Sequence, residues 1–139
     1  MSRFKDLISI LGEKGLISSF EKISTEDIER EIKENPGVPI DYIDFLQEIG
    51  FGDIGNDAYF MFYSGLIPAK DIYGEENIDE LRNILLLGDD FSGYCVGFMT
   101  SEDWALVEVD EGRNIEKLNL SFEKFAREKI FDYISNVMD

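Results

Sequence analysis

Pairs of adjacent carboxylates are the residues of this chain best suited to acid–base chemistry. They include Glu75 with Glu76, Asp89 with Asp90, Glu102 with Asp103, and Asp110 with Glu111. A glycosidase uses two carboxyl groups at a set separation, one of them with a raised pKa. With 30 Asp and Glu among 139 residues, however, adjacent pairs arise by chance. The sequence therefore favours solvated loop carboxylates over a catalytic pair.

Histidine is absent from the sequence. Its absence removes His-activated Ser or Cys nucleophiles, His-containing zinc sites and the commonest general base near neutral pH. Catalysis would have to rest on carboxylates, Lys or Tyr. We expect a protein that is not an enzyme and that has no catalytic residue, no metal and no cofactor.

Residues 50–55 match the G-x-G-x-x-G pattern of dinucleotide-binding loops. That loop needs a strand before it and a helix after it. Here a predicted helix precedes and a predicted strand follows, so the glycines are interpreted as a helix stop and a loop. Asp53, Asn56 and Asp57 carry oxygens of the kind that Ca²⁺ prefers, but their spacing does not match an EF-hand loop. An Asx-rich turn is favoured, with a weak calcium site as the alternative.

Negative charge is concentrated in the middle of the chain. Residues 40–112 hold 17 Asp and Glu against Lys70 and Arg82, which leaves 15 of the 17 net negative charges of the whole chain. Such a surface repels nucleic acid and anionic membrane and attracts a basic protein. Aromatic residues of the same region, including Tyr59–Tyr63, Phe91 and Tyr94, could anchor a protein partner, although alternation along strands sends most of them to the core.

The apolar pattern predicts helices first, strands in the middle and one helix at the end. The predicted helices run from Phe4 to Leu11 with a stop at Gly12, from Ser24 or Thr25 to just before Pro36, from Pro39 to Gly50, and from the cap Ser121 through Val137. The predicted strands are Tyr59–Tyr63, Gly65–Ile67, Ile84–Leu87, Tyr94–Met99, Trp104–Val109 and Ile115–Leu118. This order indicates an α+β fold, a mostly antiparallel sheet of about five to six strands with N-terminal helices and a C-terminal helix packed around it.

Length and composition predict one domain spanning residues 1–139. The chain shows neither the apolar run of a signal peptide nor the roughly 20 apolar residues of a membrane helix, so we expect a cytoplasmic protein. Cys95 is the single cysteine and lies in an apolar run, which predicts a buried thiol.

Several ordered motifs resemble the SUKH superfamily, which includes bacterial immunity proteins and fungal cell-wall regulators. The segment 38–46, VPIDYIDFL, is similar to the family's Leu-Pro-x-Asp-Tyr-x-x-Phe-Leu helix, and Gly50 and Gly52 follow as its Gly-x-Gly. Segments 65–72, 86–98 and 121–125 resemble the family's Pro-x-x-x-Ile turn, its acidic turn between core strands and its terminal helix. The chain departs from the family's pattern at two places. Met99 stands where many members carry Asp, and the acidic loop at 110–112 lacks the His that is often found there in the family.

For a small stand-alone member, the resemblance implies an immunity protein that binds and neutralises a toxin domain, commonly a nuclease. A nuclease presents a basic cleft, which an acidic surface can occupy without chemistry of its own. The alternative is a regulatory or scaffolding module without a toxin partner. The predicted contact face consists of Asp53, Asp57, Glu75, Glu76, Asp89, Asp90, Glu102 and Asp103.

Overall fold

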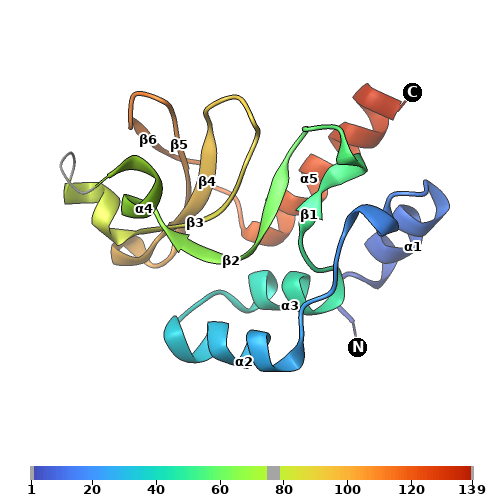
Figure 1. Ribbon diagram of the computed structural model, residues 1–139, viewed down its shortest axis with the longest axis horizontal. Coiled ribbons are helices and arrows are strands. Elements are labelled where there is room, and N and C mark those ends of the chain that lie inside the picture. The colour runs from blue at the N-terminus through green and yellow to red at the C-terminus, as the bar shows by residue number, and fades with distance from the viewer. Residues whose placement is uncertain (1, 75–78, 139) are drawn as a thin grey trace.

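The computed structural model describes residues 2–74 and 79–138 and shows an α+β fold, as the sequence predicts (Figure 1). The α-helices are α1 (Lys5–Glu13), α2 (Thr25–Glu34), α3 (Ile40–Glu48), α4 (Lys70–Tyr73) and α5 (Phe122–Tyr133), which a π-helical turn over Ile134–Met138 continues. The strands are β1 (Gly52–Asp53), β2 (Met61–Pro68), β3 (Ile84–Asp89), β4 (Cys95–Met99), β5 (Ala105–Val109) and β6 (Ile115–Lys117). Short 3₁₀ segments cover Ile17–Ser19, Ile54–Asn56, Asp79–Asn83 and Thr100–Glu102.

Two of the helices begin at the serine caps that the sequence predicts. The Ser24 hydroxyl accepts a hydrogen bond from the Asp27 amide at 3.1 Å, and the Ser121 hydroxyl accepts one from the Lys124 amide at 3.1 Å. Each bond satisfies an amide that has no partner inside the first helical turn. The stop predicted at Gly12 is wrong by one residue, because α1 continues to Glu13.

Within the described residues, the strands form one antiparallel sheet in the order β1-β2-β3-β4-β5-β6. The two strands predicted over 59–63 and 65–67 are a single strand, β2, whose register against β3 shifts between Phe62 and Ile67. A bulge of this kind bends a strand, and an apolar pattern does not distinguish it from a turn. β1 is a two-residue strand where a loop is predicted.

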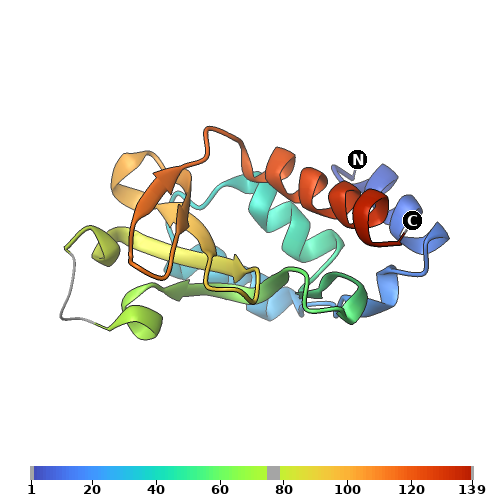
Figure 2. The same ribbon diagram turned by 90° about the horizontal axis from the view of Figure 1, so that it is seen from above.

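The sheet separates two hydrophobic clusters, because alternate side chains of a strand point to opposite faces. Val96, Phe98 and Leu106 join the helices in the larger cluster, which holds aromatic pairs such as Tyr42 and Phe122 with ring centroids 5.2 Å apart. The smaller cluster lies on the opposite face, where Ala69, Tyr73 of α4 and Leu81 pack with Cys95, Val107 and Val109. In Figures 1 and 2, α4 and α5 accordingly lie on opposite sides of the strands.

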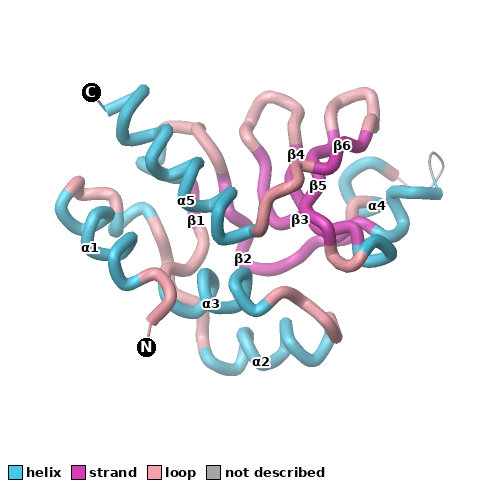
Figure 3. The backbone as a smooth tube through the Cα atoms, turned by 180° about the vertical axis from the view of Figure 1, so that it is seen from behind, coloured by secondary structure: helices cyan, strands magenta, loops and turns pink. Residues whose placement is uncertain are grey.

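The alternating strand directions place three connections at one end of the sheet. These are residues 54–60 between β1 and β2, residues 90–94 between β3 and β4, and residues 110–114 between β5 and β6. Figures 1 and 3 show all three along the upper side of the molecule. We name this end of the sheet the turn edge. The β4–β5 connection lies at the opposite end, where β2 also ends, and α4, which follows β2, folds back over the sheet toward the turn edge.

Candidate functional site

Four of the eight predicted contact residues lie at the turn edge. Asp53 ends β1 and Asp57 lies in the β1–β2 connection, while Asp89 ends β3 and Asp90 begins the β3–β4 turn. These pairs come from segments more than 30 positions apart in the sequence, and the meander of the sheet brings both to the same end. Half of the predicted set is therefore gathered by the fold.

The structure does not place the other four predicted contact residues at the turn edge. Glu102 and Asp103 lie in the β4–β5 connection, at the opposite end of the sheet, and Glu102 forms an ion pair with Lys117 at 2.8 Å. The fold therefore does not bring this pair to the turn edge, because a charge count along the chain ignores strand direction. Glu75 and Glu76 lie outside the described residues.

Two aspartates organise the β3–β4 turn. The Asp89 carboxylate accepts hydrogen bonds from the Phe91 amide at 2.8 Å and from the Tyr63 hydroxyl at 2.6 Å, and Asp90 accepts from the Tyr94 amide at 3.1 Å. Phe91 is held at φ +67°, a left-handed conformation that large side chains rarely adopt. The side chains of Phe91 and Tyr94 are 49% and 44% exposed. Asp89 and Asp90 thus shape the turn that presents two aromatic rings to solvent.

The β5–β6 turn contributes a second acidic pair. Asp110 accepts hydrogen bonds from the amide and the side-chain nitrogen of Asn114, at 2.9 and 3.1 Å, and these bonds lower the pKa of Asp110. Glu111 is exposed and lies against Gly93 of the neighbouring turn, so closely that a Cβ added to Gly93 would collide with its carboxylate. The β3–β4 and β5–β6 turns are therefore in contact.

Arg113 is the single cation between Arg82 and Lys117 in the sequence, and α4 engages its guanidinium. Its Nη2 donates to the Tyr73 carbonyl at 3.0 Å, and its Cζ lies 5.8 Å from the centroid of the Tyr73 ring. The Tyr73 hydroxyl in turn donates to the Val109 carbonyl at 3.4 Å. Arg113 thus ties the β5–β6 turn to α4.

A cavity of about 430 Å³ opens between α4 and these two turns. It is lined by Ile72, Tyr73, Asp89, Phe91, Gly93, Cys95 and Glu111. Pockets of roughly 300–1,000 Å³ with mostly apolar walls and a few polar groups are typical of ligand sites. The lining has this composition, since aliphatic, aromatic and thiol groups surround two carboxylates. A hollow of about 270 Å³ beside Tyr94 shares Glu111 with the cavity.

We name four carboxylates of these two turns the acidic rim: Asp89, Asp90, Asp110 and Glu111. Asp89 and Glu111 line the cavity, and Asp110 lines the hollow beside Tyr94. Across residues 2–74 and 79–138, the ion pairs involve other carboxylates, so the rim forms no ion pair there; Arg113, in the same turn as Asp110 and Glu111, directs its guanidinium to Tyr73 instead. Desolvation, assisted by the hydrogen bond to Asp89, raises the pKa of the Tyr63 phenol, which therefore stays protonated and acts as a donor. The rim presents carboxylates without an ion-pair partner in the described residues beside exposed aromatic rings.

The β1–β2 connection uses its carboxylates differently. Asp53 accepts hydrogen bonds from the amides of Ala58 and Tyr59, at 2.7 and 3.1 Å. Asp57 accepts from the Tyr133 hydroxyl at 2.6 Å, a bond that raises the pKa of Tyr133 to about 12. These contacts form an Asx-rich turn docked on α5. Among the described residues, no group of three or more Asp, Glu or Cys side chains is arranged to hold a metal ion.

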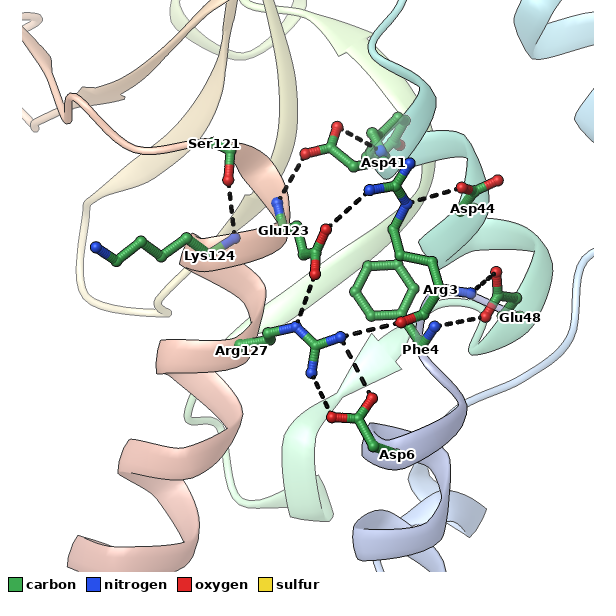
Figure 4. A network of polar contacts seen from close by, with 11 residues as sticks. Arg3, Phe4, Asp6, Asp41, Asp44, Glu48, Ser121, Glu123, Lys124 and Arg127 are labelled. Atoms are coloured by element: carbon green, nitrogen blue, oxygen red, sulfur yellow. Dashed lines mark hydrogen bonds and ion pairs between the residues drawn. The ribbon is translucent and has the colours of Figure 1, made fainter. Parts of the chain in front are cut away.

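A second charged region, shown in Figure 4, joins the first residues to α3 and α5. Arg3 pairs with Asp44 at 2.8 Å and with Glu123 at 2.9 Å. Arg127 pairs with Glu123 and with Asp6, both at 3.0 Å, and its Nη2 also donates to the Arg3 carbonyl at 3.0 Å. These arginines lower the pKa of Glu123 and of Asp6.

Two more carboxylates complete this region (Figure 4). Glu48 accepts from the Phe4 amide at 2.8 Å, and Asp41 accepts from the Glu123 amide at 2.9 Å, next to the cap of α5. We name the set the N-terminal network: Arg3, Asp6, Asp41, Asp44, Glu48, Glu123 and Arg127. Three of its acids belong to the dense central segment, so part of that charge stabilises the fold.

No family model, curated protein or solved structure matches this chain. The resemblance to the SUKH superfamily therefore stays a prediction. Among the described residues, no helix is both long enough and apolar enough to span a membrane.

The sequence reasoning missed Asp110, Glu111 and Ile72 as members of the site. Asp110 and Glu111 were visible as an acidic pair in a predicted hairpin connection. The missing step was topological: in an antiparallel meander, the first, third and fifth connections share an end. Ile72 gave no comparable signal, because it reaches the cavity through α4.

Proposed function

We propose that this protein binds a basic protein and blocks it, as an immunity protein that neutralises a nuclease toxin. It acts by occupancy and performs no catalysis. The observation that carries the proposal is the acidic rim, four carboxylates that form no ion pair in the described part of the chain. Two of them line the cavity next to the turn that exposes the rings of Phe91 and Tyr94.

Charge and exposed aromatic area serve different steps of binding. Uncompensated carboxylates accelerate the encounter with a basic surface and discriminate against anionic ones. Tyr and other aromatic side chains, once buried, supply much of the energy at the centre of an interface. A toxin that cleaves nucleic acid must hold a polyanion, so its cleft offers the complementary charge.

The test is capture from the source cells followed by inhibition. We expect the captured protein to be a basic nuclease, to lose its activity on addition of an equimolar amount of this protein, and to bind more weakly as salt rises. Capture of a regulator without toxic activity would favour the regulatory or scaffolding module instead.

A matched pair of variants locates the surface. Glu111→Lys reverses one charge of the acidic rim and should weaken binding at least tenfold. Glu29→Lys makes the same change on exposed α2, which lies across the molecule from the turn edge in Figure 1, and should leave binding unchanged. Equal effects of the two variants would exclude the acidic rim as the contact surface.

A further inference from the structure

The cavity beside α4 combines two chemistries that a single side chain can satisfy together. Its apolar wall contains Ile72 and Phe91, which are 48% and 49% exposed, and Cys95, which is 7% exposed. Its charged groups are the carboxylates of Asp89 and Glu111. An occupant needs an apolar stem and a cationic end.

We propose that this cavity receives the side chain of an arginine from the basic partner, an inference that rests on the proposed function. The methylene stem packs on Ile72 and over Cys95, and the guanidinium lies between Asp89 and Glu111. Long cationic side chains bury their stems against apolar surface while the charged end keeps polar contacts. The site is therefore a specificity pocket within the larger acidic surface.

The carboxylates are prepared to receive a donor. Each oxygen of Asp89 already accepts one bond, from the Phe91 amide or the Tyr63 hydroxyl, which fixes the carboxylate and leaves further acceptor capacity on both oxygens. Glu111 forms no hydrogen bond or ion pair with other residues in the described parts of the chain. A guanidinium bonds a carboxylate in a planar, bidentate fashion and stacks on aromatic faces such as that of Phe91, which favours Arg over Lys.

Other occupants fit less well. A phosphate or an acidic side chain would meet two carboxylates and be repelled. A wholly apolar side chain would remove Asp89 and Glu111 from water without a partner, which is costly for charged groups. A calcium ion needs six to eight oxygen ligands, and this lining offers two carboxylates.

The first experiment uses the protein alone with a small probe. N-acetyl-arginine methylamide is titrated while backbone amide shifts are followed by NMR, with the citrulline analogue as an uncharged probe of the same shape. We expect saturable shifts at Phe91, Gly93 and Cys95 with the arginine probe and at least tenfold weaker binding of the citrulline probe. Equal responses to the two probes, or shifts confined to other residues, overturn the proposal.

Variants distinguish binding of the probe in the cavity from a general effect of the protein's negative charge. Glu111→Gln should weaken binding of the arginine probe at least fivefold, whereas Glu29→Gln on α2, with the same loss of charge, should not change it. Phe91→Asn retains a residue that tolerates positive φ and should also weaken binding. An unchanged arginine titration in both Glu111→Gln and Phe91→Asn overturns the proposal.

The experiments distinguish failure of the arginine pocket from failure of the proposed function. If the captured partner binds through the acidic rim while the arginine probe gives no shifts at the cavity, the pocket is excluded and the proposed function stands. If the probe binds as described and the captured partner is not basic, the pocket stands as a cationic site and the toxin-blocking function fails.

Discussion

The N-terminal network and the acidic rim contain the same type of side chain in opposite electrostatic conditions. In the network, two arginines pair with Asp6, Asp44 and Glu123 over distances of 2.8–3.0 Å. In the rim, Asp89, Asp90 and Asp110 accept bonds from amides of their own turns or from a tyrosine hydroxyl, and no rim carboxylate forms an ion pair in the described residues. The comparison separates acids that hold the fold from acids that remain available to a partner.

The two regions differ because their residues lie at different separations along the sequence. The N-terminal network connects segments that are about 120 residues apart in sequence and fixes how α1, α3 and α5 meet. The rim connects residues two to four positions apart within single turns, apart from the bond of Tyr63. Substitutions should therefore affect stability in the first region and binding in the second.

The largest expected effect on stability comes from Arg127→Met, which keeps an unbranched stem and removes the charge. Its side chain is 23% exposed and joins Glu123, Asp6 and the Arg3 carbonyl. We expect the free energy of unfolding to fall by about 2 kcal/mol, measured by urea denaturation. Arg30→Met, which breaks an exposed pair with Asp27 on α2, should cost less than about 0.5 kcal/mol. Equal losses of stability in Arg127→Met and Arg30→Met would contradict the stabilising role of the N-terminal network.

Acid should reduce the difference in the free energy of unfolding between wild type and Arg127→Met. The network holds the pKa values of Asp6 and Glu123 below those of the unfolded chain, so its contribution is complete above about pH 4.5 and is lost as pH falls through the lower folded-state values. From pH 6 to about pH 3, the gap between wild type and Arg127→Met should narrow by about 1 kcal/mol, since the partly exposed pairs are screened. A gap that widens with acid would contradict the ion-pair explanation.

A smaller loss, about 1 kcal/mol, is expected for Asp41→Ala. This change removes the acceptor of the Glu123 amide at the first turn of α5. Asp41→Asn keeps a side-chain oxygen at the same position and should recover most of the loss in the same denaturation experiment. If Asn and Ala destabilise equally, the hydrogen bond is not the source of the effect.

The smallest effect on stability is expected at the rim. Glu111→Gln should change the free energy of unfolding by less than about 0.5 kcal/mol, because Glu111 is exposed and lacks a cationic partner among the described residues. The same variant should weaken binding of the basic partner and of the arginine probe. A loss of stability as large as that of Arg127→Met would assign Glu111 a structural role and remove the contrast between the two regions.

Local chemistry predicts most of the elements from sequence. The Ser24 and Ser121 caps and the stripe of Tyr42, Phe45 and Leu46 mark helices because helix ends and faces have short-range requirements. The strands follow from runs of branched and aromatic residues. The bulge in β2 and the two-residue strand β1 escape prediction because they depend on pairing partners, not on their own composition.

The candidate site is less accessible to sequence reasoning. Charge density alone assigns Asp89 and Glu102 to one face, yet they occupy opposite ends of the sheet. The ion pairs of Asp44 with Arg3 and of Glu102 with Lys117 neutralise acids that the sequence leaves unmatched. Both outcomes are fixed by contacts between distant segments, which composition and spacing do not encode.

The arrangement of the aromatic core has a consequence for synthesis on the ribosome. Phe45 of α3 packs on Phe4 at 5.5 Å between ring centroids and on Phe122 of α5 at 5.3 Å. Each strand pairs with its successor in the chain, so the sheet can form one hairpin at a time as the chain emerges. Strand β2 covers part of Phe45 early, because Phe62 lies 4.8 Å from it between ring centroids. The contact with Phe122 has to wait for α5, so the helical layer is the last part of the core that synthesis completes.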